Sequence, residues 1–71
     1  MNIKLGSALR KLRKDRNMTL QQLAKLSGVQ IATLSRMEHG KMTGTVECYG
    51  KIAEAYNLKL SELFERIEED L

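Results

Sequence analysis

The 71-residue chain contains no proline and no tryptophan, and it has only one cysteine, one histidine and three aromatic residues. Proline kinks the interior of a helix, so its absence fits helices that are joined by short turns. A single cysteine cannot form an internal disulfide, which favours a reducing compartment. The sequence also lacks an apolar run of the roughly 18 residues needed to span a bilayer. We therefore expect a soluble, cytoplasmic protein.

Catalytic chemistry has few residues available to it. His39 and Cys48 are the only histidine and cysteine, and the chain has neither a glycine-rich phosphate loop nor a metal-ligand cluster. A nucleophile, a base and an orienting acid therefore cannot be assembled. We expect no enzyme activity, no metal site and no cofactor. We interpret Cys48 as a small buried or half-buried side chain rather than a redox sensor.

What the chain does have is a series of apolar positions at helical spacing. Its length and its hydrophobic content of 42% suffice for one compact domain over residues 1–71, with a narrow stability margin. No segment alternates with period two, so the predicted fold class is all-α. Five helices are predicted, over about 3–16, 19–27, 30–38, 46–56 and 60–71. In chain order, their expected inner faces are Leu5, Leu9 and Leu12; Leu23 and Leu26; Val29, Leu34 and Met37; Val46, Tyr49, Ile52, Ala53 and Tyr56; and Leu60, Leu63, Phe64, Ile67 and Leu71.

Three polar or small residues define the fourth helix. Thr45 is expected to cap its start, and Asn57 tolerates the left-handed conformation that ends a helix. Gly50 lies in the middle, where glycine typically costs about 1 kcal/mol, and we interpret it as a place of close packing by a neighbour.

Residues 19–40 carry the most specific local pattern. Thr19 and Gln22 have the spacing of a capping box, in which each side chain accepts from the other residue's backbone N–H. Gly28 can adopt the left-handed conformation that ends the helix and turns the chain. The helix that follows has an apolar inner side and a polar outer side. Two short helices joined by a glycine turn are the helix-turn-helix geometry.

Four stretches support one resemblance through their order and spacing: residues 5–13, 19–40, 46–47 with 52–58, and 60–64. Together they resemble the Cro and phage-repressor type of helix-turn-helix domain, the XRE family of bacterial and phage regulators. The resemblance implies a compact five-helix domain whose helix-turn-helix is formed by the second and third helices. It also implies sequence-specific binding of double-stranded DNA in transcription regulation.

The resemblance places the helix over about 30–38 in the major groove, where base edges carry a distinct hydrogen-bonding pattern. Arg36 has the guanidinium that donates twice to guanine, and Gln30 has the amide that pairs with adenine. A core position for Ile31 and an ordinary solvated charge for Arg36 remain the alternatives. The full set of residues expected to read bases is Gln30, Ile31, Ala32, Thr33 and Arg36.

Phosphate contacts are expected on both flanks of that helix. The start of the second helix concentrates positive potential and unpaired N–H groups. The family often has a phosphate-binding glutamine where this chain has Leu20, so Gln21 or Gln22 takes that role instead, or the contact is absent. His39 fits a phosphate contact and an idle surface position equally well. The expected phosphate ligands are Thr19, Gln21, Gln22, His39, Lys41 and Thr43.

The net charge of +3 is unevenly distributed. Residues 1–41 hold nine Lys/Arg against two Asp/Glu, giving +7, whereas residues 42–71 hold three against seven, giving −4. A basic front and an acidic back suit a surface that faces a polyanion. The alternative is a solvated helix face, since Arg10, Lys11, Arg13, Lys14 and Arg16 lie in one segment.

In the family, the positions of Arg13 and Glu38 form a structural ion pair that ties the first helix to the end of the third. The alternative is a phosphate contact by Arg13. The family also commonly binds DNA as a twofold dimer, and here the fifth helix is the expected interface, through Leu60, Leu63, Ile67 and Leu71. The alternative for this helix is that Leu63 and Phe64 close the core of their own chain while Leu71 frays.

Three functions from different classes follow. The first is a sequence-specific transcriptional regulator, a repressor or an activator, that binds an operator as a homodimer. The second is an antitoxin or restriction-modification controller with the same fold. The third is a helical protein-interaction module. The sequence determines neither the operator, nor any effector or toxin partner, nor whether 71 residues are the full length.

Overall fold

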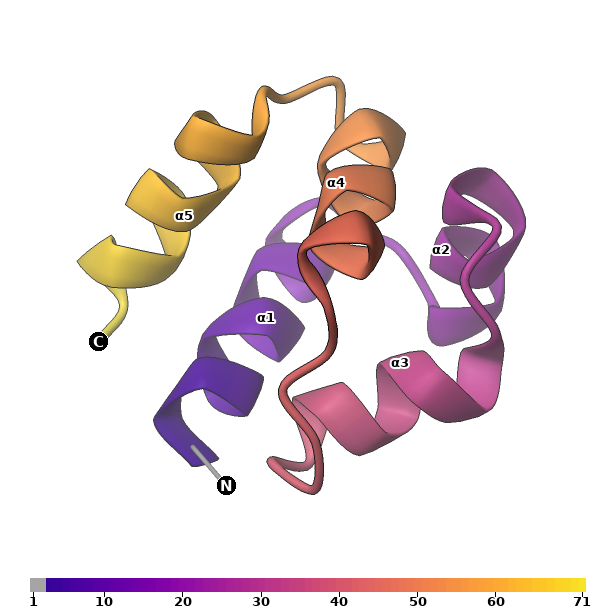
Figure 1. Ribbon diagram of the computed structural model, residues 1–71, viewed down its shortest axis with the longest axis horizontal. Helices are drawn as coiled ribbons and strands as arrows, with labels where there is room; N and C mark the ends of the chain where they lie inside the picture. The colour runs from indigo at the N-terminus through magenta and orange to yellow at the C-terminus, as the bar shows by residue number, and fades with distance from the viewer. Residues whose placement is uncertain (1–2) are drawn as a thin grey trace.

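The computed structural model describes residues 3–71 and contains five α-helices in this part of the chain (Figure 1). They are α1 (Ile3–Asp15), α2 (Leu20–Ser27), α3 (Ile31–Glu38), α4 (Val46–Ala55) and α5 (Leu60–Glu69). No strand occurs among residues 3–71, so the predicted all-α, five-helix architecture is confirmed. None of the helices in this range is long and apolar enough to cross a membrane.

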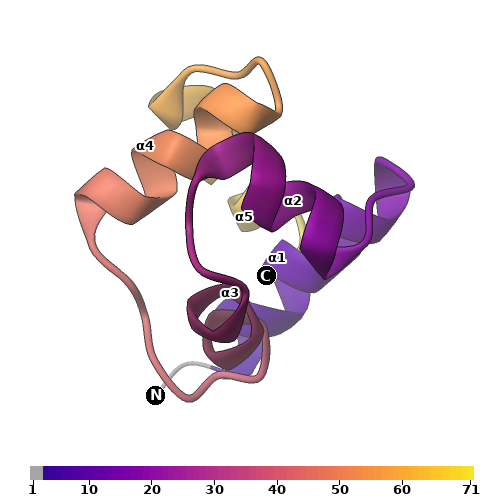
Figure 2. The same ribbon diagram turned by 90° about the vertical axis from the view of Figure 1, so that its right-hand side faces the viewer.

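The helices are arranged so that α1 lies between α3 and α5. α1 packs against both of them, α2 packs against α3 and α4, and α4 packs against α5. In Figure 1, α3 forms the lower edge of the molecule and α5 lies at the upper left. Figure 2, turned by 90°, shows α3 nearly end-on below α2. One side of α3 is therefore at the surface of the fold.

The local signals that delimit the helices are confirmed. The Thr19 hydroxyl accepts from Gln22 N–H at 3.1 Å, and Gln22 Oε1 accepts from Thr19 N–H at 2.9 Å. Gly28 has a φ of 75°, the left-handed conformation that ends α2. Thr45 caps α4 by accepting from Cys48 N–H at 3.1 Å, and Asn57 has a φ of 57°. The helix ends differ from the expected ones by one or two residues because capping residues such as Thr19 lie outside the helix proper.

The core is formed by side chains from all five helices. Its most deeply buried member is Leu63 of α5, with no exposed area, and Leu34 of α3 is 2% exposed. Burial of this kind is the main source of stability in a small domain. The complete cluster is Ala8, Leu9, Leu12, Leu23, Val29, Leu34, Met37, Tyr49, Ile52, Ala53, Tyr56, Leu63 and Ile67.

Four apolar residues that were expected to face the core are exposed, namely Leu26, Val46, Phe64 and Leu71. Leu26 is 61% exposed and Val46 is 71% exposed. In α2, Leu23 is buried and residues 20, 24 and 27 are half-buried, which is the i, i+3, i+4, i+7 stripe, and Leu26 falls outside it. Val46 is the first residue of α4 and lies one turn before the buried part of that helix. The expectation of close packing at Gly50 is also wrong, because a Cβ there would meet no atom within 4 Å.

The expected dimer interface on α5 needs correction. Leu63 is fully buried and Ile67 is 3% exposed, both within their own chain, so they cannot present a surface to a partner. The reason is that α5 packs against both α1 and α4, and these two helices together cover its apolar stripe. Leu60 is half-buried against the same core. Leu71, 56% exposed, and Phe64, 37% exposed, are the apolar residues of this segment that remain at the surface.

Candidate nucleic-acid interface

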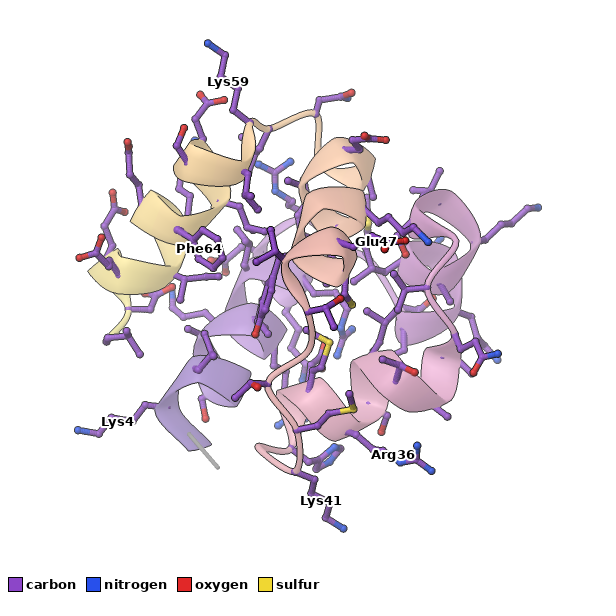
Figure 3. The ribbon with its side chains drawn as sticks, in the orientation of Figure 1. Lys4, Arg36, Lys41, Glu47, Lys59 and Phe64 are labelled. Atoms are coloured by element: carbon purple, nitrogen blue, oxygen red, sulfur yellow. The ribbon has the colours of Figure 1, made fainter. Side chains whose placement is uncertain are left out.

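The two sides of α3 have different environments. Leu34, Met37 and Glu38 face the core and are buried. Ile31 is 43% exposed, so the alternative that it is a core side chain is wrong. Figure 3 shows Arg36 projecting away from the body of the protein at the lower edge. The residues expected to read bases lie on this outer side, with Gln30, Ile31, Ala32 and Arg36 exposed and Thr33 half-buried.

A buried ion pair fixes the end of α3 to α1. Arg13 Nε donates to Glu38 Oε2 at 2.7 Å, and Arg13 Nη2 donates to Glu38 Oε1 at 3.0 Å. The hydrogen bonds to Glu38 raise the pKa of Arg13, so the guanidinium is held in its charged form. A bidentate pair of this kind fixes orientation as well as distance. Because Arg13 is only 8% exposed, a phosphate contact by this side chain does not fit its position.

The same guanidinium also fixes the start of the helix-turn-helix. Arg13 Nη1 donates to the backbone oxygen of Met18 at 2.7 Å, one residue before the Thr19 cap of α2. One side chain of α1 therefore contacts the residue before the motif and Glu38, the last residue of α3.

A close backbone approach completes the attachment of α3. A Cβ atom built on Gly6 of α1 would lie 2.6 Å from the carbonyl oxygens of both Met37 and Glu38. Because those contacts are with backbone, no side chain can move aside to make room. Glycine at position 6 lets α1 touch the last turn of α3 directly.

The start of α2 is arranged as a set of hydrogen-bond donors. In the capping box, Thr19 Oγ1 and Gln22 Oε1 are both used as acceptors within the chain. The Thr19 hydroxyl hydrogen and the Gln22 amide NH₂ group are not used in the capping box and can still donate hydrogen bonds. Both side chains are exposed, as is that of Gln21. These donors lie at the positive end of the helix dipole. The arrangement suits an anion such as a phosphate.

Lys14, which is not among the phosphate ligands expected from the sequence, lies beside this helix start. An open depression is lined by Lys14, Asn17, Met18, Thr19 and Leu20, together with Arg13. The left-handed Asn17, with a φ of 56°, turns the chain between α1 and α2 and so brings Lys14 next to the cap. The signal available in the sequence was an asparagine two residues before a capping threonine.

The second flank is formed by the end of α3 and the loop that follows. His39, Lys41 and Thr43 are all exposed there, and Figure 3 shows Lys41 directed outward at the lower edge. The His39 ring Nδ1 lies 2.7 Å from the backbone oxygen of Ser35, which also accepts from His39 N–H at 3.0 Å. The loop is held from behind, because the Tyr49 hydroxyl donates to the backbone oxygen of Thr43.

The basic segment of α1 is divided by the fold. Lys11 pairs with Asp15 at 3.2 Å and with Asp70 of the C-terminal segment at 3.5 Å. Arg16 lies over the Tyr56 ring, 4.8 Å from its centroid, and donates to the Tyr56 backbone oxygen at 3.0 Å. Burial raises the pKa of Tyr56 to about 12, so the ring beneath Arg16 stays neutral. Arg10 and Lys14 are exposed and form no ion pair with an acidic side chain among residues 3–71.

Cys48 takes no part in this surface. It is half-buried in α4, with Sγ 3.6 Å from the sulfur of Met37. Burial raises the pKa of its thiol, so the reactive thiolate is disfavoured. This environment matches the expectation of a packed, half-buried cysteine.

An outward helix held by a preceding helix, with exposed hydrogen-bond donors on one flank and an exposed loop carrying Lys41 on the other, is the arrangement of a helix-turn-helix domain. The chain belongs to the Cro/C1-type helix-turn-helix family, since the family model described as "Helix-turn-helix" (HTH_3) matches residues 9–63. Its relatives in this family are named HTH-type transcriptional regulators, and one of them is named a repressor.

The relatives differ in how much of their own length this chain covers. An HTH-type transcriptional regulator of Archaeoglobus fulgidus, itself termed uncharacterized, is 35% identical over 67 residues, 94% of each chain. The regulator DdrOP3 of Deinococcus deserti is 29% identical over 93% of this chain but 51% of its own length. The transcriptional repressor RghR of Bacillus subtilis is 53% identical over 36 residues, 51% of this chain and 27% of its own.

Proposed function

We propose that this chain is a transcriptional regulator that binds double-stranded DNA sequence-specifically, with α3 in the major groove. The observation that carries the proposal is that α3 has a buried inner side and a solvent-exposed outer side. Leu34, Met37 and the Arg13–Glu38 pair hold the inner side. The outer side is then rigid enough to present side chains to base edges in a fixed register.

Each outer residue matches a chemical feature of a base pair. The Arg36 guanidinium suits two parallel hydrogen bonds to guanine O6 and N7, and the Gln30 amide suits adenine N6 and N7. Ile31 and Ala32 offer apolar surface for a thymine methyl group, and Thr33 lies at the rim. Each good bidentate pair contributes about 1–3 kcal/mol of discrimination against the wrong base.

Phosphate contacts would fix the domain on the duplex from both sides of α3. On the first flank, the donors are Thr19, Gln21, Gln22 and the nearby Lys14. On the second flank, they are His39, Lys41 and Thr43. Such contacts position the protein without reading sequence, and they make the affinity fall as salt rises.

We further propose that two chains bind together across two half-sites about 34 Å apart, since one short helix reads only a few base pairs. The support is the small size of the reading surface. A twofold-symmetric footprint with two chains per duplex is the expected result. A strict monomer in scattering experiments with DNA, at tens of micromolar protein, would contradict the dimer and leave the reading of one half-site intact.

The test of the main proposal is selection of bound duplexes from a random library, followed by footprinting and a salt titration. We expect an enriched sequence and a logarithm of affinity that falls linearly with the logarithm of salt concentration. Binding without enrichment would remove sequence specificity, and the absence of salt-dependent binding would favour a protein-interaction module instead.

Three variants separate reading from positioning. Arg36→Ala is expected to relax the preference at one base pair, at a cost of about 1–3 kcal/mol. Lys41→Ala is expected to weaken binding to all sequences and to reduce the salt slope by about 1. Lys59→Ala is the matched control, because Figure 3 shows Lys59 at the opposite edge of the molecule from Lys41. An equal effect of the two lysine variants would contradict the proposed face.

A further inference from the structure

The contacts of the His39 ring indicate which of its two nitrogens carries the proton when the ring is neutral. Its Nδ1 lies 2.7 Å from the backbone oxygen of Ser35, and a carbonyl oxygen can only accept a hydrogen bond. A hydrogen bond between these two atoms therefore requires the proton on Nδ1. The Ser35 hydroxyl lies 3.5 Å from the same nitrogen, so the contact with the backbone oxygen is the shorter of the two. A neutral imidazole carries one N–H, so in its neutral form the ring is left with Nε2 as an acceptor.

A DNA phosphate is also only an acceptor. It therefore cannot form a hydrogen bond with neutral His39, because the remaining ring nitrogen carries a lone pair and is also an acceptor. The imidazolium differs in two ways, because it carries N–H groups on both nitrogens and a positive charge. The bond to Ser35 is kept in both forms, so protonation changes only what the ring offers outward.

The charges around His39 leave the counter-ion of an imidazolium to come from outside the chain. Arg36 and Lys41 are the neighbouring cations, and Figure 3 shows both at the same edge. None of the ion pairs among residues 3–71 includes His39. The charged residues of the elements near this end of α3 are Lys4, Arg10, Lys11, Arg13, Lys14 and Asp15 of α1, Lys25 of α2, and Glu47, Lys51 and Glu54 of α4.

Three of the acidic groups near this end of α3 already have a cationic partner. Glu38, next to His39 in the chain, is turned inward onto Arg13, and its side chain is 5% exposed. Asp15 pairs with Lys11, and Glu47 pairs with Lys51 within α4. A phosphate on the duplex would therefore supply the negative charge that pairs with a protonated His39.

We propose that His39 is a proton-linked phosphate ligand: it binds a DNA backbone phosphate through Nε2–H only as the imidazolium, and each such contact takes up a proton. This inference rests on the proposed DNA-binding function. Because the bound state holds more protons than the free state, the affinity for DNA rises as pH falls.

The experiment compares wild type with His39→Gln and His39→Lys. Gln keeps a neutral donor and Lys keeps a permanent positive charge, so neither changes charge near neutrality. The probe is a short random-sequence duplex at fixed low salt, which suffices because phosphate contacts are independent of sequence. Fluorescence anisotropy gives the dissociation constant at several pH values, and thermal melts at the same pH values confirm that each protein is folded.

We expect the wild-type affinity to rise about threefold or more between pH 8 and pH 6, with a limit of about tenfold per pH unit for one proton. Both variants should give nearly flat profiles, with His39→Lys at pH 8 about as tight as wild type at pH 6. Long-range ¹⁵N–¹H correlation spectra of the free protein should show the neutral ring protonated at Nδ1.

The outcomes separate the two proposals. Salt-dependent binding with the same pH profile in all three proteins would overturn the role of His39 and leave the DNA-binding function standing. A neutral ring protonated at Nε2 would overturn it as well, without reference to DNA. Absence of salt-dependent duplex binding by wild type at every pH would overturn both.

Discussion

The contacts that hold α3 and the contacts that hold α5 differ in kind. α3 is fixed by a bidentate ion pair, Arg13–Glu38, and by the backbone approach at Gly6, in addition to apolar side chains. α5 is fixed chiefly by Leu63 and Ile67, which are buried against α1 and α4. The ion pair between Lys11 of α1 and Asp70, the residue after α5, joins partly exposed side chains.

The difference follows from what each helix has to do. Apolar burial is non-directional, so it stabilises a helix without fixing how the helix is rotated about its axis. A bidentate ion pair and a backbone contact have a preferred geometry, so they specify rotation and distance. Under the proposed function, α3 needs that precision because its outer residues would have to meet base edges, whereas α5 supplies stability at the acidic back of the domain.

Breaking the ion pair is expected to have the largest effect on this comparison. Glu38→Ala leaves the buried Arg13 charge without its partner and should lower the free energy of unfolding by about 3–5 kcal/mol. Chemical denaturation measures the loss. The matched control is Glu47→Ala, which breaks the exposed Glu47–Lys51 pair and should change stability by less than about 1 kcal/mol. Equal losses in the two variants would show that the buried pair has no special role.

A double variant, Arg13→Met with Glu38→Leu, sharpens the same point. Apolar side chains of similar volume often replace a buried ion pair without loss of stability. We expect this protein to fold but to bind DNA more weakly than wild type, because the orientation of α3 is no longer specified. Unchanged affinity for the selected duplex would contradict an orienting role for the pair.

Truncating the back of the core should cost somewhat less. Leu63→Ala removes a fully buried side chain of α5 and is expected to lower stability by about 2–5 kcal/mol. Leu71→Ala, at a residue that is 56% exposed and follows the end of α5, should change stability by no more than about 0.5 kcal/mol. Urea titrations monitored by circular dichroism measure both. A large loss from Leu71→Ala would reveal burial of this residue by a second chain.

Two glycines within helices should respond to alanine with opposite signs. Gly6→Ala forces a methyl group against the carbonyl oxygens at the end of α3 and should destabilise by about 1–3 kcal/mol. Gly50→Ala adds a methyl group in open space within α4 and should stabilise by about 0.5–1 kcal/mol. Melting temperatures of the two variants give the signs directly, and a loss from Gly50→Ala would reject the open space at that position.

The effect on stability is expected to be small at the two helix caps, and there DNA binding distinguishes two otherwise similar residues. Thr19→Ala and Thr45→Ala each remove one N-cap hydrogen bond and should each cost about 1 kcal/mol. Only Thr19→Ala also removes a proposed phosphate donor, so it should weaken DNA binding more than Thr45→Ala does. Anisotropy titrations under conditions in which both variants are folded check this, and equal affinities would exclude Thr19 from the interface.

The parts of the fold that the sequence predicts correctly are those governed by local interactions. The capping box at Thr19 and Gln22, the left-handed Gly28 and the cap at Thr45 depend on neighbouring residues alone, and all three are present. The outward side of α3 follows from the same local reasoning, since an apolar stripe identifies its inner side.

The predictions that were wrong concern which part of the protein covers a given side chain. This is determined by how whole helices pack against one another. The stripe on α5 correctly indicates burial, but the sequence does not say whether its own chain or a second chain buries Leu63 and Ile67. The exposure of Leu26 depends on how α2 is rotated against α3 and α4. Likewise, Lys14 lies beside Thr19 only because of the angle of the turn at Asn17.

The guanidinium of Arg13 reaches the carbonyl of Met18 before α2 and the carboxylate of Glu38 at the close of α3. Because a single planar group fastens both extremities of the two-helix segment, neither can swing independently of α1. Thermal fluctuations should therefore release the two extremities together rather than one at a time, which amide hydrogen exchange can follow. Under the proposed function, substitutions along α1 that shift this group would then alter DNA recognition without any of the altered atoms touching DNA.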